Sequence, residues 1–294
     1  MGLADAPPVD SFRVPVPGGE VAAYSMGSGP DVLFLVNGGP GIVSSGIRAD
    51  HAWLAEKGWR VVAHDQLGTG ASDCPDDPSL WTIARYGDEI EAVRRALGLG
   101  TVHLLGHSWG GWLSCDYVCR YPGSVKSLIA ANTGADMALH LAELRRLIGA
   151  FGVETQTMVD RHEATGTLKD AEYRAFCTLF YCRHQNRRPT GERLPEGITK
   201  LNMQIQMALW GPAEFSCTGS LRGWSRLDDL RRFTSPCLVF NGVHDYLTIR
   251  EGAEIQAAVA GSEMTVFANS GHMPARDEPE AYRTVVEGFL ERHR

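Results

Sequence analysis

Six short apolar runs, separated by segments of helical pattern, restrict the fold of this chain more than any other feature. They cover residues 31–37, 59–65, 101–107, 125–132, 237–242 and 263–269. Each run is almost continuously apolar instead of alternating, which is typical of strands covered on both faces. Between two of them, Ile83, Tyr86, Ile90 and Val93 recur at helical spacing. The chain is therefore predicted to be an α/β protein, with a mostly parallel sheet and helices on both faces.

The alternation stops between about Gly134 and Leu230, where nearly a hundred residues contain no convincing strand. Three stretches there are helical in pattern, namely 138–151, 171–182 and 198–210. We expect a helical cap inserted into a single α/β core, with the chain divided as 1–133 (core), 134–230 (cap) and 231–294 (core). Open α/β sheets bind ligands at the carboxyl ends of their strands, so such an insertion would cover the site. Before the first run, FRVPV and EVAAYSM flank Pro17-Gly18-Gly19 and predict a β-hairpin.

Composition and charge argue against several classes of protein, including nucleic-acid-binding, membrane-spanning and secreted proteins. The formal net charge is −7 and the pI is near 5.8, which argues against nucleic acid as a partner. No run approaches the roughly 20 apolar residues that span a bilayer, and the start MGLADAPPVD lacks the basic and apolar parts of a secretory signal. Seven cysteines without a CxxC pair suggest small buried side chains in a reducing compartment and no zinc site. We expect a cytoplasmic protein without membrane attachment, metal or organic cofactor; the oligomeric state stays open.

Residues 106–111 read GHSWGG, between the predicted strand 101–107 and a helix that starts with WLSCDYV. This strand–turn–helix context is that of the G-x-S-x-G nucleophile elbow, which presents a serine at the tip of a sharp turn. Gly106 and Gly110 allow the close backbone approach that such a turn requires. Ser108 is therefore the predicted nucleophile.

A serine hydroxyl is a weak nucleophile at neutral pH and needs a base. On a hydrolase-type sheet the base is a histidine near the end of the chain. His272, in SGHMP, follows the last predicted strand and precedes the last helix, so it is the predicted base. His107, inside the elbow, is expected to point away from the serine's partner. The other histidines lie in strands, cap or helices without a matching partner.

The base needs an acid that orients it. Asp245 lies just past the strand 237–242, one strand before His272, and is the predicted acid. Asp136 is the competitor, because some enzymes of this fold carry the acid one strand earlier; we expect it instead to start the cap. Asp65 is expected to hold the loop after its strand.

The loop NGGPG at 37–41 follows the strand 31–37. A tetrahedral oxyanion needs two backbone N–H donors, one from the residue after the nucleophile and one from such a loop. Trp109 is the first predicted donor. Gly39 is the second, because a side chain there would obstruct the approaching carbonyl. A phosphate-binding loop would require G-x-x-x-x-G-K-[ST] or G-x-G-x-x-G, and neither fits here.

Together these motifs resemble the proline iminopeptidase family of α/β-hydrolases, a group of serine aminopeptidases. NGGPG is similar to the family's HGGPG, DQLGTGASD to DQRGxGxS, GHSWGG to G-x-S-W-G-G, and GPAEF with SLRGW to the cap motif GPNEF. GVHD and SGHMP fall where the family has its acid and base. The resemblance extends over nearly the whole chain.

The resemblance implies that Glu214, in GPAEF, reaches from the cap to the substrate's terminal amine, where a buried ammonium needs a carboxylate partner. Two positions depart from the family: Tyr246 replaces a second glutamate after the acid, and Asn37 replaces the histidine of HGGPG. Tyr246 is expected to contact the substrate through its hydroxyl. Aromatic and methionine side chains of the cap either line an apolar substrate channel or form the cap's own core: Phe176, Phe180, Tyr181, Met203, Met207 and Trp210.

The expected function is cleavage of the amide after an N-terminal aminoacyl group through an acyl-enzyme. The substrate would be a small molecule or short peptide with a free amine; some relatives act on bulky amides such as aminoacylated macrolactam intermediates. Three alternatives stay open. An esterase or lactonase would use the same triad without Glu214, a cofactor-free oxygenase or lyase would use only His272 and Asp245, and a ligand receptor would have no turnover.

Overall fold

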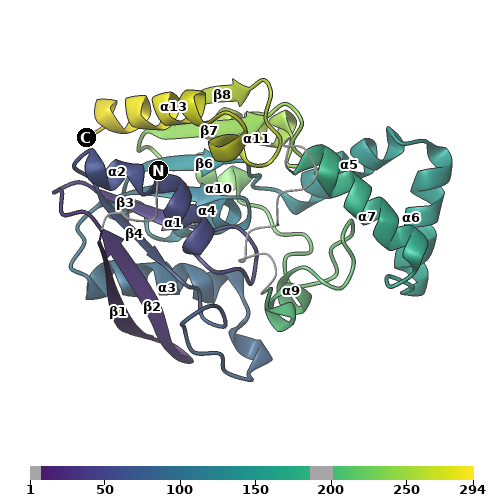
Figure 1. Ribbon diagram of the computed structural model, residues 1–294, viewed down its shortest axis with the longest axis horizontal. Coiled ribbons are helices and arrows are strands. Elements are labelled where there is room, and N and C mark those ends of the chain that lie inside the picture. The colour runs from purple at the N-terminus through teal and green to yellow at the C-terminus, as the bar shows by residue number, and fades with distance from the viewer. Residues whose placement is uncertain (1–7, 186–200) are drawn as a thin grey trace.

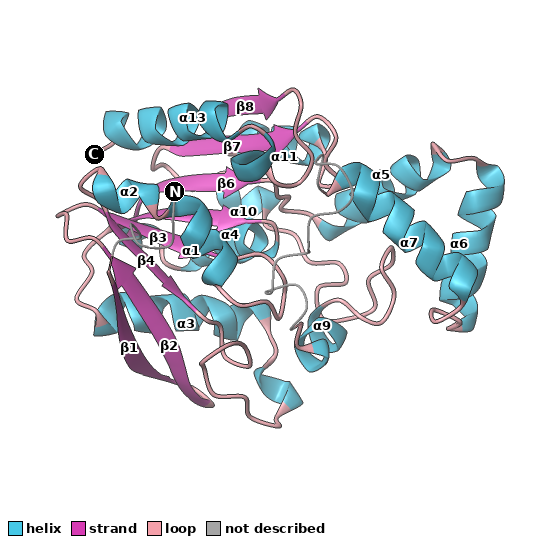
Figure 2. Cartoon of the chain, in the orientation of Figure 1, coloured by secondary structure: helices cyan, strands magenta, loops and turns pink. Residues whose placement is uncertain are grey.

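A computed structural model describes residues 8–185 and 201–294 of the chain. Its centre is one eight-stranded sheet (Figures 1 and 2). In spatial order the strands are β1 (Val9–Val16), β2 (Gly19–Met26), β4 (Arg60–His64), β3 (Val32–Val36), β5 (Val102–His107), β6 (Val125–Ala131), β7 (Cys237–Gly242) and β8 (Glu263–Phe267). The β1–β2 and β2–β4 pairs are antiparallel, and every other pair is parallel. The predicted hairpin and the predicted mostly parallel sheet are confirmed. The ends of β3 to β8 differ from the predicted runs by at most two residues, and β1 begins three residues before the predicted FRVPV segment.

The sheet separates two apolar layers, because successive strand residues point to opposite faces. In β3, Phe34 packs in one layer while Leu33 and Leu35 pack in the other. The first layer contains helices α3 (Ile83–Ala96), α4 (Trp109–Arg120) and α11 (Ile249–Ala258). The second contains α1 (Ser45–His51), α2 (Trp53–Glu56) and α13 (Pro279–Arg292). The remaining short elements of the core are 3₁₀ turns at Pro78–Leu80 and Pro122–Ser124 and helix α12 (Pro274–Asp277).

A helical segment connects β6 to β7. It contains α5 (Met137–Gly149), α6 (Val153–Thr165), α7 (Ala171–His184), α9 (Met203–Leu209) and α10 (Leu227–Leu230). Figure 1 shows α5, α6 and α7 beyond the carboxyl ends of β6 and β7. The predicted helical stretches 138–151, 171–182 and 198–210 correspond to α5, α7 and α9, and they did not include α6. Residues 198–200 of the third stretch lie outside the described residues. In the described part of the chain, no helix is both long and apolar enough to cross a membrane.

Two predictions about aspartates are confirmed. Asp136 caps α5, where its Oδ1 accepts from the backbone N–H of Leu139 at 2.7 Å. Asp65, directly after β4, accepts from the backbone N–H and the hydroxyl of Ser44 and from the N–H of Ala71. It therefore holds the loop that follows its strand and is not available as a reacting group.

Candidate active site

Ser108 stands in a strained turn between β5 and α4. Its backbone has φ +58° and ψ −125°, in the region that residues with a side chain rarely adopt. A Cβ at Gly106 would lie 2.3 Å from the carbonyl oxygen of Gly110, and a Cβ at Gly110 would lie 2.1 Å from that of Val36. Glycine is thus required at both positions, for the predicted reason of close backbone approach.

Asp245 and His272 meet at the carboxyl edge of the sheet, after β7 and β8. Nδ1 of His272 donates to Oδ1 of Asp245 at 2.9 Å, and both side chains are buried. Asp245 also accepts from the backbone N–H of Leu247 at 3.0 Å and, through Oδ2, from Nδ2 of Asn132 at 2.7 Å. The carboxylate, held in place by its other donors, orients the His272 ring in the tautomer in which Nε2 is the free base.

Asn132 is a site residue that the sequence reasoning missed, because we placed it inside the strand 125–132. The strand ends at Ala131, and Asn132 turns into the left-handed region with φ +48°. Asparagine tolerates this conformation better than most residues. The Asn-Thr-Gly sequence at the end of an apolar run was the signal that could have revealed this turn.

The expectation for His107 was wrong. Its Nε2 donates to the backbone carbonyl of His272 at 2.8 Å, and the two rings are 4.7 Å apart. Burial, with the nearby His272 as a second cause, lowers the pKa of His107 to about 3. His107 is therefore neutral at physiological pH and braces the loop that carries His272.

The NGGPG loop lies beside the elbow, since a Cβ at Gly38 would be 3.3 Å from the Cβ of Ser108. Asn37 braces the loop with two hydrogen bonds from Nδ2, to the carbonyls of Gly38 at 2.9 Å and Ile42 at 2.7 Å. Gly39 has φ +145°, and a Cβ there would lie 2.9 Å from the next-but-one amide nitrogen. The conformation of the loop's own backbone thus requires glycine at position 39, whether or not a substrate carbonyl approaches.

The backbone N–H groups of Gly39 and Trp109 donate to no acceptor within the described residues. Trp109 is the first residue of α4, where N–H groups have no partner in the helix and the helix dipole favours negative charge. Both residues and Ser108 line the same pocket. This arrangement is suited to binding an oxyanion formed at Ser108.

Two pockets meet at Ser108, and they share Gly39, Ser108 and Tyr246. The first, here the Glu214 pocket, encloses about 610 Å³ including its open mouth. Its other lining residues are Pro40, Trp109, Trp112, His140, Leu144, Phe180, Tyr181, Gln206, Trp210, Glu214, Leu221 and Leu247. Glu214 is exposed, and its Oε2 accepts from the Tyr181 hydroxyl at 2.6 Å. The predicted contact residues Glu214, Tyr246 and Trp210 therefore lie in one pocket with Ser108.

The second, here the His272 pocket, is larger, with about 1290 Å³ including its open mouth. Its wall is largely apolar, with Ile42, Val43, Ile47, Met273 and Pro274 among its residues. His272 and His107 line this pocket and not the other. The base and the carboxylate of Glu214 therefore line different pockets, and Ser108 belongs to both.

Tyr246 lies where the two pockets join. Its ring centroid is 4.4 Å from that of His272, and its hydroxyl has a hydrogen-bonding interaction with Ser108. Burial, followed by the charge of Asp245, raises the pKa of the phenol well above its usual value. Tyr246 is therefore a neutral phenol next to the nucleophile, at the position where the family has a glutamate.

The aromatic and methionine side chains of the helical segment divide between both expected roles. Phe176 and Phe180 belong to the segment's own core, and Phe180 also reaches the Glu214 pocket. Tyr181 and Trp210 line that pocket. Met203 and Met207 are about half exposed, at 55% and 46%, and line neither pocket.

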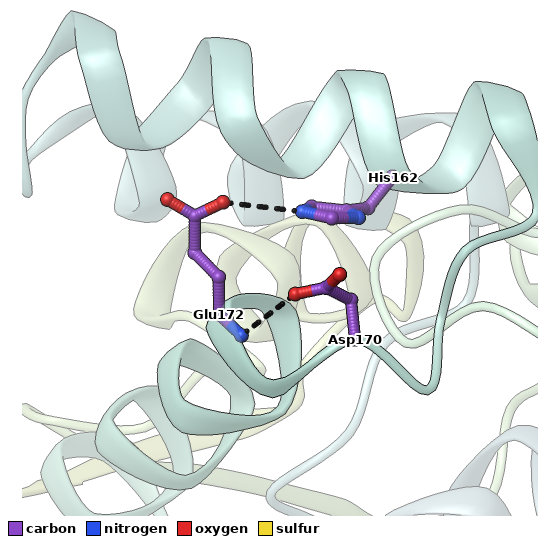
Figure 3. Close-up of side chains that lie close together, drawn as sticks. All are labelled: His162, Asp170 and Glu172. Carbon is purple, nitrogen blue, oxygen red and sulfur yellow. Dashed lines mark hydrogen bonds and ion pairs between the residues drawn. The ribbon is translucent and has the colours of Figure 1, made fainter.

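Among the described residues, one cluster has the composition of a metal site: His162, Asp170 and Glu172 (Figure 3). Each already has a protein partner. Glu172 accepts from Arg161 at 2.7 Å, and Asp170 caps α7. Nδ1 of His162 bonds to Thr167 at 2.8 Å. These contacts explain why the three side chains lie together: they connect α6 to α7.

Known proteins share the whole architecture. The family described as alpha/beta hydrolase fold matches residues 31–279. The proline iminopeptidase of Levilactobacillus brevis is 34% identical over 265 residues, which cover 89% of this chain and 88% of that protein. The crystal structure of proline iminopeptidase from Mycobacterium smegmatis has a TM-score of 0.88 at 30% identity and covers 97% of this chain and 98% of its own. The crystal structure of VinJ has a TM-score of 0.90 at 30% identity, with 98% and 100% covered. The chain belongs to the proline iminopeptidase family of α/β-hydrolases.

Proposed function

We propose that the protein is a serine hydrolase that cleaves the amide after an N-terminal aminoacyl group. The observation that carries this proposal is the pair of pockets that meet at Ser108, with a carboxylate in one and the base in the other. The aminoacyl group occupies the Glu214 pocket, where the carboxylate pairs with the substrate's ammonium. The leaving group occupies the His272 pocket.

The reaction follows from this placement. Oγ of Ser108 attacks the amide carbon while Nε2 of His272 takes its proton, and Asp245 stabilises the imidazolium. The oxyanion accepts from the N–H groups of Gly39 and Trp109. As the C–N bond breaks, His272 returns the proton to the leaving amine. Water, deprotonated by His272, then attacks the ester on Ser108 and releases the free amino acid.

The size and apolar wall of the His272 pocket support a bulky, apolar leaving group. An amide of small molecules, such as a macrolactam intermediate that carries an aminoacyl group, fits this description as well as a short peptide does. The helical segment between β6 and β7 serves as the cap, because it contributes Glu214, Tyr181 and Trp210 to the Glu214 pocket.

The test is a panel of arylamides with a free or an N-acetylated amine, assayed with wild type, Ser108→Ala and Glu214→Gln. Free-amine substrates should be cleaved, acetylation should abolish cleavage, and Ser108→Ala should lose at least about 10³-fold in kcat. Glu214→Gln should raise KM for free amines about tenfold or more, since it removes the charged partner. Gln206→Ala, also in the pocket, is the matched control.

Equal cleavage of free and blocked amines would contradict the aminopeptidase proposal. Aryl esters that are hydrolysed well and are indifferent to Glu214→Gln would indicate an esterase. Activity retained in Ser108→Ala would indicate chemistry by His272 and Asp245 alone.

A further inference from the structure

His140, at the start of α5, is a buried polar group in the Glu214 pocket that the proposed reaction does not use. The residue is 2% exposed, and its ring packs against two indoles, 5.3 Å from that of Trp112 and 5.5 Å from that of Trp210. All three side chains line the pocket. Leu144 and Leu221 also line this pocket, and an imidazole buried against two indoles requires an explanation.

The tautomer of His140 is fixed by a second buried residue. Nδ1 of His140 donates to Oε1 of Glu251 at 2.8 Å. The other oxygen of Glu251 accepts from the backbone N–H of Thr248 at 2.7 Å, in the capping box of α11. The carboxylate thus holds the ring as an Asp–His pair does in a hydrolase, with Nδ1 protonated. In the neutral ring, Nε2 then has a free lone pair.

Nε2 of His140 is accessible from the Glu214 pocket. It bonds to no acceptor or donor within the described residues. Some buried polar atoms have neither contact with solvent nor a hydrogen-bond partner, for example Nδ1 of His64 and Nε2 of His103. Nε2 of His140 is not one of these atoms. Because the residue is 98% buried and lines the Glu214 pocket, the accessible part of its ring faces that pocket.

From this geometry we infer that His140 is a specificity residue that accepts a hydrogen bond from a hydroxyl on the side chain of the substrate's first residue. The inference rests on the proposed function, in which the aminoacyl group occupies this pocket. A hydroxyl is the group that fits: it supplies the donor that Nε2 lacks and brings no second charge beside Glu214. An aliphatic side chain of the same size leaves the buried lone pair without a partner, which costs binding energy.

The test compares arylamides of matched first residues with free amines: serine with alanine, threonine with valine, and tyrosine with phenylalanine. In wild type, the hydroxyl member of at least one pair should have a kcat/KM higher by about tenfold or more. His140→Gln should reduce that ratio to within about threefold of unity. Leu144→Met, a change of similar volume in the same wall, should keep it.

The ratio within a pair does not depend on how much enzyme is folded, so a destabilised His140→Gln protein still gives a valid result. No hydroxyl preference in wild type would overturn the inference even if that variant fails to fold. A loss in His140→Gln that is equal for both members of a pair would also overturn it and would assign His140 a structural role. If free-amine substrates are not cleaved at all, the proposed function itself fails, and this inference fails with it.

Discussion

Tyr246 occupies the position at which the family has a second glutamate, and its surroundings differ from what a carboxylate would require. Its ring packs against His272, and its hydroxyl interacts with Ser108. Ring packing on the base is a contact that a glutamate cannot supply. A neutral phenol also adds no negative charge to a site that already holds Asp245 and Glu214. The tyrosine is therefore suited to positioning the nucleophile and the base.

Tyr246→Phe separates these two contributions, because it keeps the ring and removes the hydroxyl. We expect kcat on free-amine arylamides to fall about tenfold, the value of one well-placed hydrogen bond, with a melting temperature changed by no more than a few degrees. Steady-state kinetics and thermal unfolding measure the two effects. Tyr181→Phe is the matched control; its hydroxyl contacts Glu214 and not Ser108, so it should change KM more than kcat. Wild-type kcat in Tyr246→Phe would show that only the ring matters.

Among the elements, the NGGPG loop depends on a side chain that the family's motif does not contain. Asn37 donates twice, to carbonyls on both sides of the loop, and so closes it around Gly39. A histidine at 37 has one ring N–H to donate in its neutral form. The loop is therefore braced differently here from the HGGPG form.

Asn37→Ala should release the loop and misalign the N–H of Gly39. Loss of one oxyanion donor costs about 10²–10³ in kcat, and partial misalignment should cost about tenfold or more, with KM little changed. Asn37→His, which restores the family's residue, should lie between alanine and wild type. Steady-state measurements of kcat and KM for the three proteins test this ranking. If alanine and wild type have the same kcat, the brace is not needed for catalysis.

At the scale of the whole molecule, the sequence predicted the parts that depend on local pattern and chain order. The ends of β3 to β8 were correct within two residues because continuous apolar runs specify buried parallel strands. Ser108, Asp245 and His272 were chosen because one sheet edge collects them in a fixed order. The contacts of Asn132 and His107 were missed, since each joins residues more than 100 positions apart. Such contacts depend on the three-dimensional arrangement of the loops. No local pattern in a single sequence indicates that arrangement.

The whole molecule should also lose stability as the pH falls below neutrality, because several histidines are buried in neutral form. Burial lowers the pKa of His103 to about 4 and that of His107 to about 3, and it lowers the pKa of His51 as well. In the unfolded chain these side chains titrate near 6.5. Between the folded and unfolded values, the unfolded state binds more protons, so the free energy of unfolding rises with pH in that range.

We therefore expect the free energy of unfolding to be greatest above about pH 6.5 and to decrease as the pH falls from there toward 4. Each buried histidine should contribute at most about 1.4 kcal/mol per pH unit. Denaturant unfolding at pH 7.5, 6 and 5 measures the slope. His103→Gln keeps a polar side chain near Ser127 but cannot titrate, so its slope should be smaller than that of wild type by about one proton. A free energy of unfolding that does not change between pH 7.5 and 5, or a slope unaffected in His103→Gln, would contradict this account of the buried histidines.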